Sequence, residues 1–366
     1  MIAVRPAFAP HEWVATARIK AIDFARGVAV ALMIVSHGVK GLLPFEDIPA
    51  WGLVPVHLVT KFASTLFFIV FGISLAASYV PYTESADWPR KKRKLLIRGM
   101  LILFWYKVLT IVEMFQQYKP GEIIDTLLYR SFPVYSEILG FYAIALLWLP
   151  FVIPLWRRIP AWLRWCSPML CALTAWFLHR SFQFFGCESL HAILVEHENH
   201  YTWGQLARLP MVLFGMLIGG YFAEAWSRRV VVAFILLAAS ILLFIVFYLT
   251  VGSGQVVAEL FALARNEGKH PPEFAFVVFS AAGALGVVSA SLYFGNQLAA
   301  WFKPITLIGS NALQAFIFHL SVLFVGYRFL LGYWHQISYQ QALLLTLVLL
   351  CLTALWIAVL RWIHGK

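Results

Sequence analysis

The chain has 366 residues, of which 61% are hydrophobic and 12% are charged, against roughly 45 to 50% and about 25% in a soluble globular domain. Apolar runs long enough to cross about 30 Å of hydrocarbon recur from end to end. This pattern excludes a soluble protein and predicts a single transmembrane domain over residues 1–366. The net charge of +11 does not indicate a nucleic-acid partner, because the basic residues are sorted by side of the predicted membrane.

The apolar pattern predicts an all-α, polytopic membrane protein with about ten transmembrane helices. Short loops on one side are rich in Lys and Arg, above all the run 90–94, which predicts cytoplasmic termini and a cytoplasmic segment over residues 1–24. No small-residue cleavage pattern follows the basic start of the chain, so we expect the first span to be retained. The expected spans are 25–44, 56–79, 95–117, 135–156, 161–182, 205–225, 229–251, 273–295, 304–327 and 340–362.

The first span carries three polar side chains where hydrocarbon is expected. Arg26 and His37 are eleven residues apart, which on a helix returns to within about 20° of the same face and climbs about 16 Å. Asp23 lies within ion-pair distance of Arg26 and close to the face of His37. Ionisable groups in a membrane predict a functional site. An interfacial Asp/Arg pair with a histidine bonded to a carbonyl is the structural alternative.

The third span begins at a dense basic run, residues 90–98, and continues into the membrane. Two explanations of this run stay open: a determinant of topology, or a site for a polyanion at the membrane face. Lys107 lies midway along the span, too deep for easy snorkelling, so we expect it to face the bundle interior. Glu113 lies near the exit.

The ninth span supplies a second histidine. His319 lies about fifteen residues, or roughly 22 Å, from the cytoplasmic end, a depth similar to that of His37, so the two are expected to share a cavity. Ser310, Asn311 and Gln314 precede His319 and are predicted to line a passage to it. Hydrogen bonding between helices is the alternative for the two amides.

The outer loops 183–204 and 252–272 are long enough to fold over an outward-facing cavity. His197 and His200 have a spacing that suits a metal, but isolated loop histidines are common, and we predict that no metal is required. In the sixth span, Gly215 and Gly219 have the small-xxx-small spacing of close helix packing.

The first span resembles the opening of the membrane-bound acyltransferases, the superfamily of acyltransferase family 3 and the heparan-alpha-glucosaminide N-acetyltransferase-like proteins. The resemblance rests on Ile-Asp-Phe-Ala-Arg-Gly-Val-Ala around Arg26, on the Arg-x10-His spacing to His37, and on residues 65–74 and 308–319. Family 3 proteins commonly have Ser-Gly where this chain has Phe71-Gly72. The phrase Gly-Ser-Asn-Ala-Leu at 309–313 is closer to the second branch.

The resemblance implies transfer of an acyl group, usually acetyl from cytoplasmic acetyl-CoA, to an extracytoplasmic glycan or lipid-linked sugar across a bacterial-type inner membrane. His37 is the expected general base, with Arg26, Asp23 and His319 beside it. Asn311, Gln314, Ser310 and Lys107 are the expected substrate-binding residues. Arg26, Arg93, Lys94 and Arg98 are expected to hold the CoA. Whether the protein forms homo-oligomers stays open.

Two other classes of function stay open on the sequence. A proton-coupled secondary transporter would use His37, Lys107 and His319 as a relay across the bundle. A structural or export-assisting membrane subunit would use the buried polar groups for packing alone. Binding of acetyl-CoA separates the transferase from both.

Overall fold

The computed structural model describes residues 19–115, 117–223 and 226–364, and within these ranges 81% of the chain is helical and no strand is present. The long helices are α1 (Lys20–Lys40), α3 (Phe62–Ser78), α4 (Trp88–Met114), α6 (Glu137–Arg158), α7 (Ala161–Ser181), α9 (Gln205–Ala223), α10 (Arg229–Val251), α12 (Phe274–Phe294) and α16 (Tyr339–Ile363). The shorter α-helices are α2 (Ala50–Gly52), α5 (Pro120–Leu127), α8 (Glu188–Val195), α11 (Val256–Ala264), α13 (Asn296–Trp301), α14 (Lys303–Ser310) and α15 (Ala312–Ser321). Five single 3-10 turns are η1 (Phe45–Asp47), η3 (Val59–Lys61), η4 (Val80–Tyr82), η5 (Phe184–Gly186) and η6 (Trp226–Arg228), and two π-helical segments are η2 (Leu53–His57) and η7 (Val322–Leu330).

Eight helical runs among the described residues are long and apolar enough to cross a membrane, which confirms an all-α polytopic membrane protein. They are 20–40, 50–82, 88–114, 137–158, 229–251, 274–294, 312–330 and 339–363. Helices α7 and α9 occupy the two other expected spans and are not part of that count. The number ten and the cytoplasmic termini stay predictions. Of the expected segment 1–24, residues 1–18 lie outside the described residues, and 20–24 form the start of α1.

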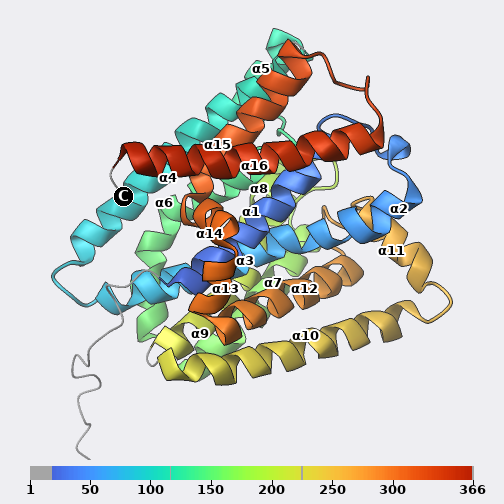
Figure 1. Ribbon diagram of the computed structural model, residues 1–366. Coiled ribbons are helices and arrows are strands. Elements are labelled where there is room, and N and C mark those ends of the chain that lie inside the picture. The colour runs from blue at the N-terminus through green and yellow to red at the C-terminus, as the bar shows by residue number, and fades with distance from the viewer. Residues whose placement is uncertain (1–18, 116, 224–225, 365–366) are drawn as a thin grey trace, which may run out of the picture.

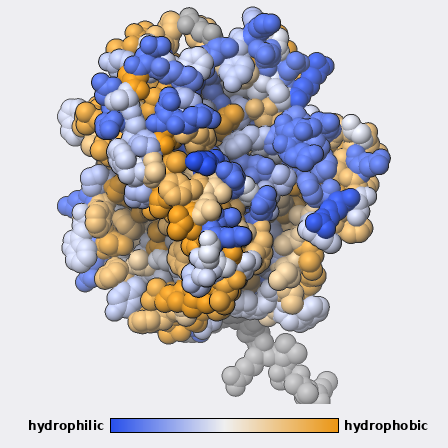
Figure 2. All heavy atoms as spheres, turned by 90° about the vertical axis from the view of Figure 1, so that its right-hand side faces the viewer, coloured by the Kyte–Doolittle hydropathy of each residue, from blue (hydrophilic) through white to orange (hydrophobic). Residues whose placement is uncertain are grey.

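The long helices run between two sides of the bundle (Figure 1). Lys20 and Arg361 line one cavity, so both described ends of the chain lie on the same side, which we call the terminal side. The opposite side carries α2 and α11 and is called the loop side. Figure 2 looks onto the loop side and shows hydrophilic side chains gathered over much of it, with apolar ones between and below them.

Helix α1 is among the most enclosed helices of the bundle. Its apolar stretch is 67% buried, against 22% for α16 and 28% for α10, so other helices surround α1 while α16 and α10 lie at the periphery. Close approach around it depends on small residues, because helices in a membrane associate mainly by packing. A Cβ on Gly27 would lie 1.9 Å from the carbonyl oxygen of Ile305 in α14.

The predicted packing role of the sixth-span glycines is confirmed. In α9, a Cβ on Gly215 would lie 2.1 Å from the carbonyl oxygen of Ile69 in α3, and one on Gly219 would lie 2.7 Å from that of Ile73. No larger residue fits between these two helices without a backbone shift.

The ninth span is interrupted, where the sequence predicts one continuous helix over 304–327. Helix α14 ends at Ser310, Asn311 adopts φ −133° and ψ 43°, and α15 begins at Ala312. A break at membrane depth is tolerated only where protein groups satisfy the backbone. Here the carbonyl of Gly309 accepts a hydrogen bond from Nη1 of Arg26 at 3.2 Å, which ties the interruption to α1.

Candidate active site

Two histidines from distant parts of the chain meet in the interior of the bundle. Nδ1 of His37 in α1 lies 3.2 Å from Nε2 of His319 in α15, and the two rings stack with centroids 5.5 Å apart. His319 is fully buried. The structure therefore brings together the two imidazoles that the sequence placed at one depth.

The hydrogen bonds of this pair determine which nitrogen of His37 is left to accept a proton. Nδ1 of His319 lies 2.9 Å from the carbonyl oxygen of Ala315; since a carbonyl only accepts, this Nδ1 carries the hydrogen. In a neutral ring its Nε2 is then an acceptor, so Nδ1 of His37 donates to it. Nε2 of neutral His37 consequently has a lone pair, and it has no hydrogen-bond partner among the described residues. This is the arrangement of a general base held by a second group.

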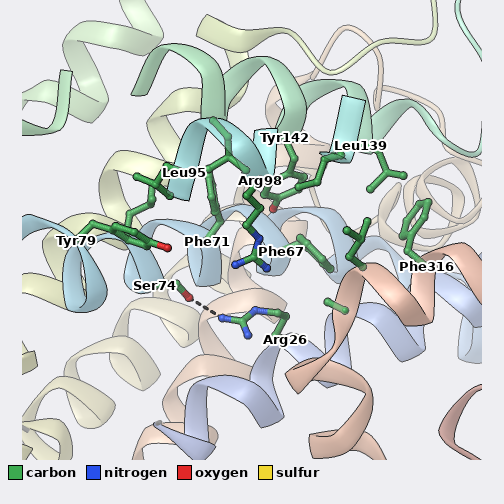
Figure 3. Close-up of a pocket in the computed structure, with 15 residues that line it drawn as sticks. Arg26, Phe67, Phe71, Ser74, Tyr79, Leu95, Arg98, Leu139, Tyr142 and Phe316 are labelled. Carbon is green, nitrogen blue, oxygen red and sulfur yellow. Dashed lines mark hydrogen bonds between the residues drawn. The ribbon is translucent and has the colours of Figure 1, made fainter. Parts of the chain in front are cut away.

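A cavity of about 140 Å³ lies on the terminal side of the histidine pair. Arg26 and Arg98 point toward each other across it from α1 and α4 (Figure 3). Its wall includes Phe316, whose ring centroid lies 6.1 Å from that of His37 and 5.0 Å from that of His319. The two arginines thus share a chamber that ends against the histidine pair.

Arg26 is fixed by hydrogen bonds to three segments of the bundle. Its Nη1 lies 3.0 Å from Oδ1 of Asp23 and donates to Gly309, and its Nη2 donates to Oγ of Ser74 in α3 at 2.7 Å. The Asp23/Arg26 ion pair expected from the sequence is present. It joins α1, α3 and the interrupted span at the mouth of the cavity.

Tyr142 of α6 adds an unusual hydroxyl to this cavity. It lines the chamber, and among the described residues its buried Oη has no hydrogen-bond partner. A buried hydroxyl without a partner is costly, and most such groups in proteins are satisfied. This one is available to a group that enters the cavity.

A second, smaller cavity of about 40 Å³ lies on the loop side, and His37 lines it together with Lys61, Tyr135, Tyr201 and Lys269. The ring of Tyr135 packs edge-on against His37, with centroids 5.3 Å apart. His37 is therefore flanked by an arginine-lined chamber on the terminal side and a lysine-lined cavity on the loop side.

Glu113 positions the segment that carries Tyr135. Its carboxylate accepts hydrogen bonds from the backbone N–H groups of Val134, Tyr135 and Ser136 at 2.7 to 3.0 Å. The Tyr135 hydroxyl in turn donates to the carbonyl of Lys40, 2.7 Å away. A carboxylate at the end of α4 thus holds the aromatic wall beside His37.

Several predicted site residues lie away from the histidine pair. Nζ of Lys107 donates to the carbonyl of Leu127 at 2.8 Å and lies 3.4 Å from the ring centroid of Tyr129, and Lys107 lines neither cavity. Of the three residues that a transporter relay would use, His37 and His319 are therefore in contact, whereas Lys107 is bound elsewhere.

The polar residues of the ninth span lie in different environments. Nδ2 of Asn311 donates to Oγ of Ser310 at 2.8 Å at the helix break, while Gln314 is exposed on α15. Arg93 and Lys94 are exposed near the start of α4, and Arg98, which is also exposed, is the member of that basic run that lines the arginine chamber.

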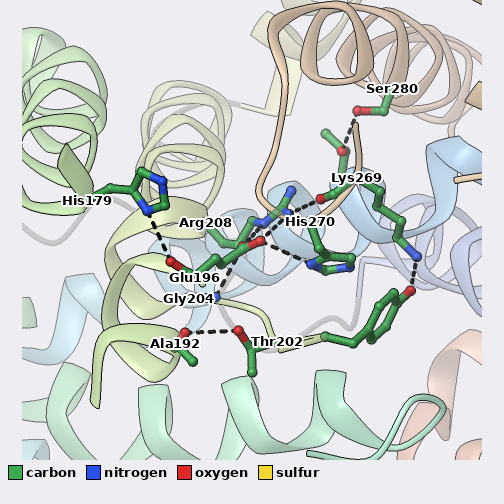
Figure 4. Close-up of polar contacts among 11 residues, drawn as sticks. His179, Ala192, Glu196, Thr202, Gly204, Arg208, Lys269, His270 and Ser280 are labelled. Carbon is green, nitrogen blue, oxygen red and sulfur yellow. Dashed lines mark hydrogen bonds and ion pairs between the residues drawn. The ribbon is translucent and has the colours of Figure 1, made fainter. Parts of the chain in front are cut away.

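A buried ion pair that the sequence alone did not single out joins the segment 183–204 to α9. Both oxygens of Glu196 bind Arg208, and Oε2 also lies 3.0 Å from Nδ1 of His270 (Figure 4). Burial raises the pKa of Glu196, but Arg208 and His270 outweigh it and hold that pKa below its usual value. Burial lowers the pKa of His270 to about 4. The network fixes loop 252–272 over the loop-side cavity.

Glu188, His197 and His200 each place a ligand atom within 4.8 Å of the other two. The prediction that no metal is required stays a prediction.

Three lysines and Tyr142 were not predicted as site residues. Lys61 had a usable signal, because it is a cation inside the predicted span 56–79 and so falls under the same rule as Lys107. Lys269 lies on the loop that was expected to cover an outward cavity. Lys40 looked like an ordinary helix-end cation, and nothing in the sequence marks Tyr142.

Comparison with known families gives one result that covers the whole bundle. A family model described as an acyltransferase domain matches residues 19–362, which confirms the resemblance to acyltransferase family 3. A search among curated proteins found no match.

Proposed function

The chain belongs to the acyltransferase domain family, and from that premise we propose that it moves an acyl group from a cytoplasmic acyl-CoA to a hydroxyl or amine of an extracytoplasmic glycan or lipid-linked sugar. Acetyl-CoA is the proposed donor and a bacterial-type inner membrane the proposed location. The observation that carries the proposal is the His37–His319 pair, whose hydrogen bonds leave Nε2 of His37 as a base between two cavities.

The arginine chamber is the proposed donor site. Arg26 and Arg98 present guanidinium groups suited to phosphate or polarised carbonyl oxygens, and Arg98 is exposed at the terminal side, the side predicted to be cytoplasmic. The chamber is too small for a whole CoA, so the nucleotide end would remain near the exposed basic run while the acyl end reaches Phe316.

In the proposed reaction, Nε2 of His37 is the atom that takes the proton of the acceptor. The acceptor O–H or N–H gives its proton to Nε2 of His37 as the oxygen or nitrogen attacks the thioester carbonyl. The C–S bond then breaks, and the CoA thiolate leaves and takes up the proton that Nε2 of His37 releases, which returns His37 to its neutral form. During attack, negative charge develops on the carbonyl oxygen, and the unpartnered Tyr142 hydroxyl is the proposed donor for it. His319 acts on His37, which it orients, and is a positioning residue.

The test is transfer of labelled acetyl from acetyl-CoA to a surface-glycan extract by purified protein in nanodiscs. We expect His37→Ala to lower transfer by roughly 10²- to 10⁴-fold, with membrane insertion and acetyl-CoA binding retained. His364→Ala is the matched control, because His364 is exposed at the end of α16. Unchanged transfer by His37→Ala, or solute uptake without acetyl-CoA binding by the wild type, would refute the proposal.

A further inference from the structure

Three lysines from separate segments gather at the loop-side cavity: Lys61 and Lys269 line it, and Lys40 binds Asn266, another lining residue. Lys40 ends α1, Lys61 precedes α3, and Lys269 belongs to loop 252–272. The amines of Lys40 and Lys61 both donate to Oδ1 of Asn266, Lys40 at 3.2 Å. Nζ of Lys269 donates to the hydroxyl of Tyr201 at 2.5 Å. The amines are thus anchored by neutral oxygen atoms beside His37.

No described carboxylate neutralises these lysines. None of the three forms an ion pair among the described residues, and Glu196, the acid whose charge acts on Lys269, is already bound by Arg208 and His270. Lys61 is only 3% exposed, so its charge is poorly solvated. Burying like charges together without a counter-charge is strongly unfavourable. An anion bound between the three amines would relieve this unfavourable burial.

The surroundings are those of a site for a small charged group. Burial and the neighbouring cations Lys40 and Arg208 hold the pKa of Lys269 well below its usual value, which an anion at the cluster would offset. The cavity of about 40 Å³ exceeds the roughly 10 to 15 Å³ that one water requires. Ser36 and Ser64 line it too and supply hydroxyl donors.

We propose that Lys40, Lys61 and Lys269 form a binding site for a carboxylate or phosphate group, and that this anion is part of a substrate whose reacting atoms lie at His37. The inference rests on the proposed acyl transfer and extends it, because it makes one of the two substrates negatively charged. Two sources present the same chemistry. The anion is either an acidic group of the acceptor, or the free carboxylate of a dicarboxylic acyl group such as succinyl.

Anion binding is measured first, without any reaction. Purified protein in nanodiscs is titrated with succinate and with inorganic phosphate at low millimolar concentration, and thermal unfolding is followed. We expect one or both to raise the Tm of the wild type and of Lys119→Met, a control that removes an exposed lysine. In Lys61→Met and Lys269→Met the half-saturating concentration should rise on the order of tenfold or more, while Lys61→Arg should retain binding. No rise in wild-type Tm with either anion, or equal titrations in wild type and both Met variants, would overturn the proposal.

Transfer assays then identify the source of the anion. If the acyl group carries it, wild type prefers succinyl-CoA to acetyl-CoA, and Lys61→Met loses that preference. If the acceptor carries it, Lys61→Met raises the KM for the acidic acceptor with either donor. Transfer by Lys61→Met that matches wild type with both donors and the acidic acceptor would overturn the assignment.

Failure of the two proposals can be told apart. His37→Ala should lower transfer by roughly 10²- to 10⁴-fold and leave the succinate or phosphate titration intact, because His37 lies beside the lysines without holding them. If wild type transfers no acyl group yet binds the anion through Lys61 and Lys269, the transferase proposal fails and the anion site stands.

Discussion

Replacement of His319 tests the hydrogen-bond chain that makes His37 a base. In wild type, Nδ1 of His319 is bonded to Ala315, and Nε2 accepts from His37. When His37 takes the acceptor proton it becomes charged, and a hydrogen bond to a charged group contributes about 1.5 to 3 kcal/mol. At about 1.36 kcal/mol per tenfold in rate, His319→Ala should lower kcat by about 10- to 150-fold. The KM for acyl-CoA should stay constant, since His319 does not line the arginine chamber.

Two amide variants make the test specific. The side-chain amide of glutamine ends near the position of Nε2, so His319→Gln should recover part of kcat. Asparagine reaches only the position of Nδ1, so His319→Asn should resemble His319→Ala. The assay is steady-state transfer from labelled acetyl-CoA in nanodiscs. Equal kcat values for the Gln and Ala variants, or a raised KM with unchanged kcat in the Ala variant, would refute the assigned roles.

Three further predictions concern the donor chamber, the helix packing and the loop network. Arg98→Gln should raise the KM for acyl-CoA roughly threefold to tenfold, whereas Arg130→Gln, an exposed arginine outside both the chamber and the basic run 90–98, should not; equal KM values would contradict the donor site. Gly215→Leu should lower the Tm in detergent, at a cost of about 1 to 3 kcal/mol for overpacking, while Gly220→Leu, which meets no neighbouring atom, should not; equal Tm values would contradict the packing. Because burial lowers the pKa of His270 from 6.5 to about 4, the folded state binds fewer protons, so up to about 3 kcal/mol of stability present above pH 6.5 is lost as pH falls to about 4. His270→Gln should reduce this loss in thermal melts, and an unchanged pH dependence would contradict it.

The fold class could be predicted from the sequence because hydrocarbon imposes a simple rule. Only helices with long apolar runs satisfy their backbone in a membrane, so composition and periodicity indicate most of the spans. Helical geometry likewise places Arg26 and His37 on the same face of α1. The interruption at Asn311 was not predictable in this way, because it is stabilised partly by a hydrogen bond from Arg26, a residue far away in sequence.

The candidate site was predictable only where its members are unusual along the chain. His37 and His319 each stand out as an imidazole inside an apolar run. The lysine cluster does not, because Lys40, Lys61 and Lys269 come together only after three segments have packed. Gln314 is a case in which the sequence predicted a site residue that the structure places elsewhere. Its position in the sequence indicates a residue that lines the passage, but its side chain is exposed, because its direction depends on the rotation of α15 after the break.

The central claim is that His37 is the base of an acyl transfer to an extracytoplasmic glycan. The most direct measurement is the mass of surface glycans from cells that lack the protein, complemented with either wild type or His37→Ala at equal membrane abundance. We predict that the deletion removes one acyl group per modified unit, that wild type restores it, and that His37→Ala does not. Restoration of the acyl group by His37→Ala would contradict the account.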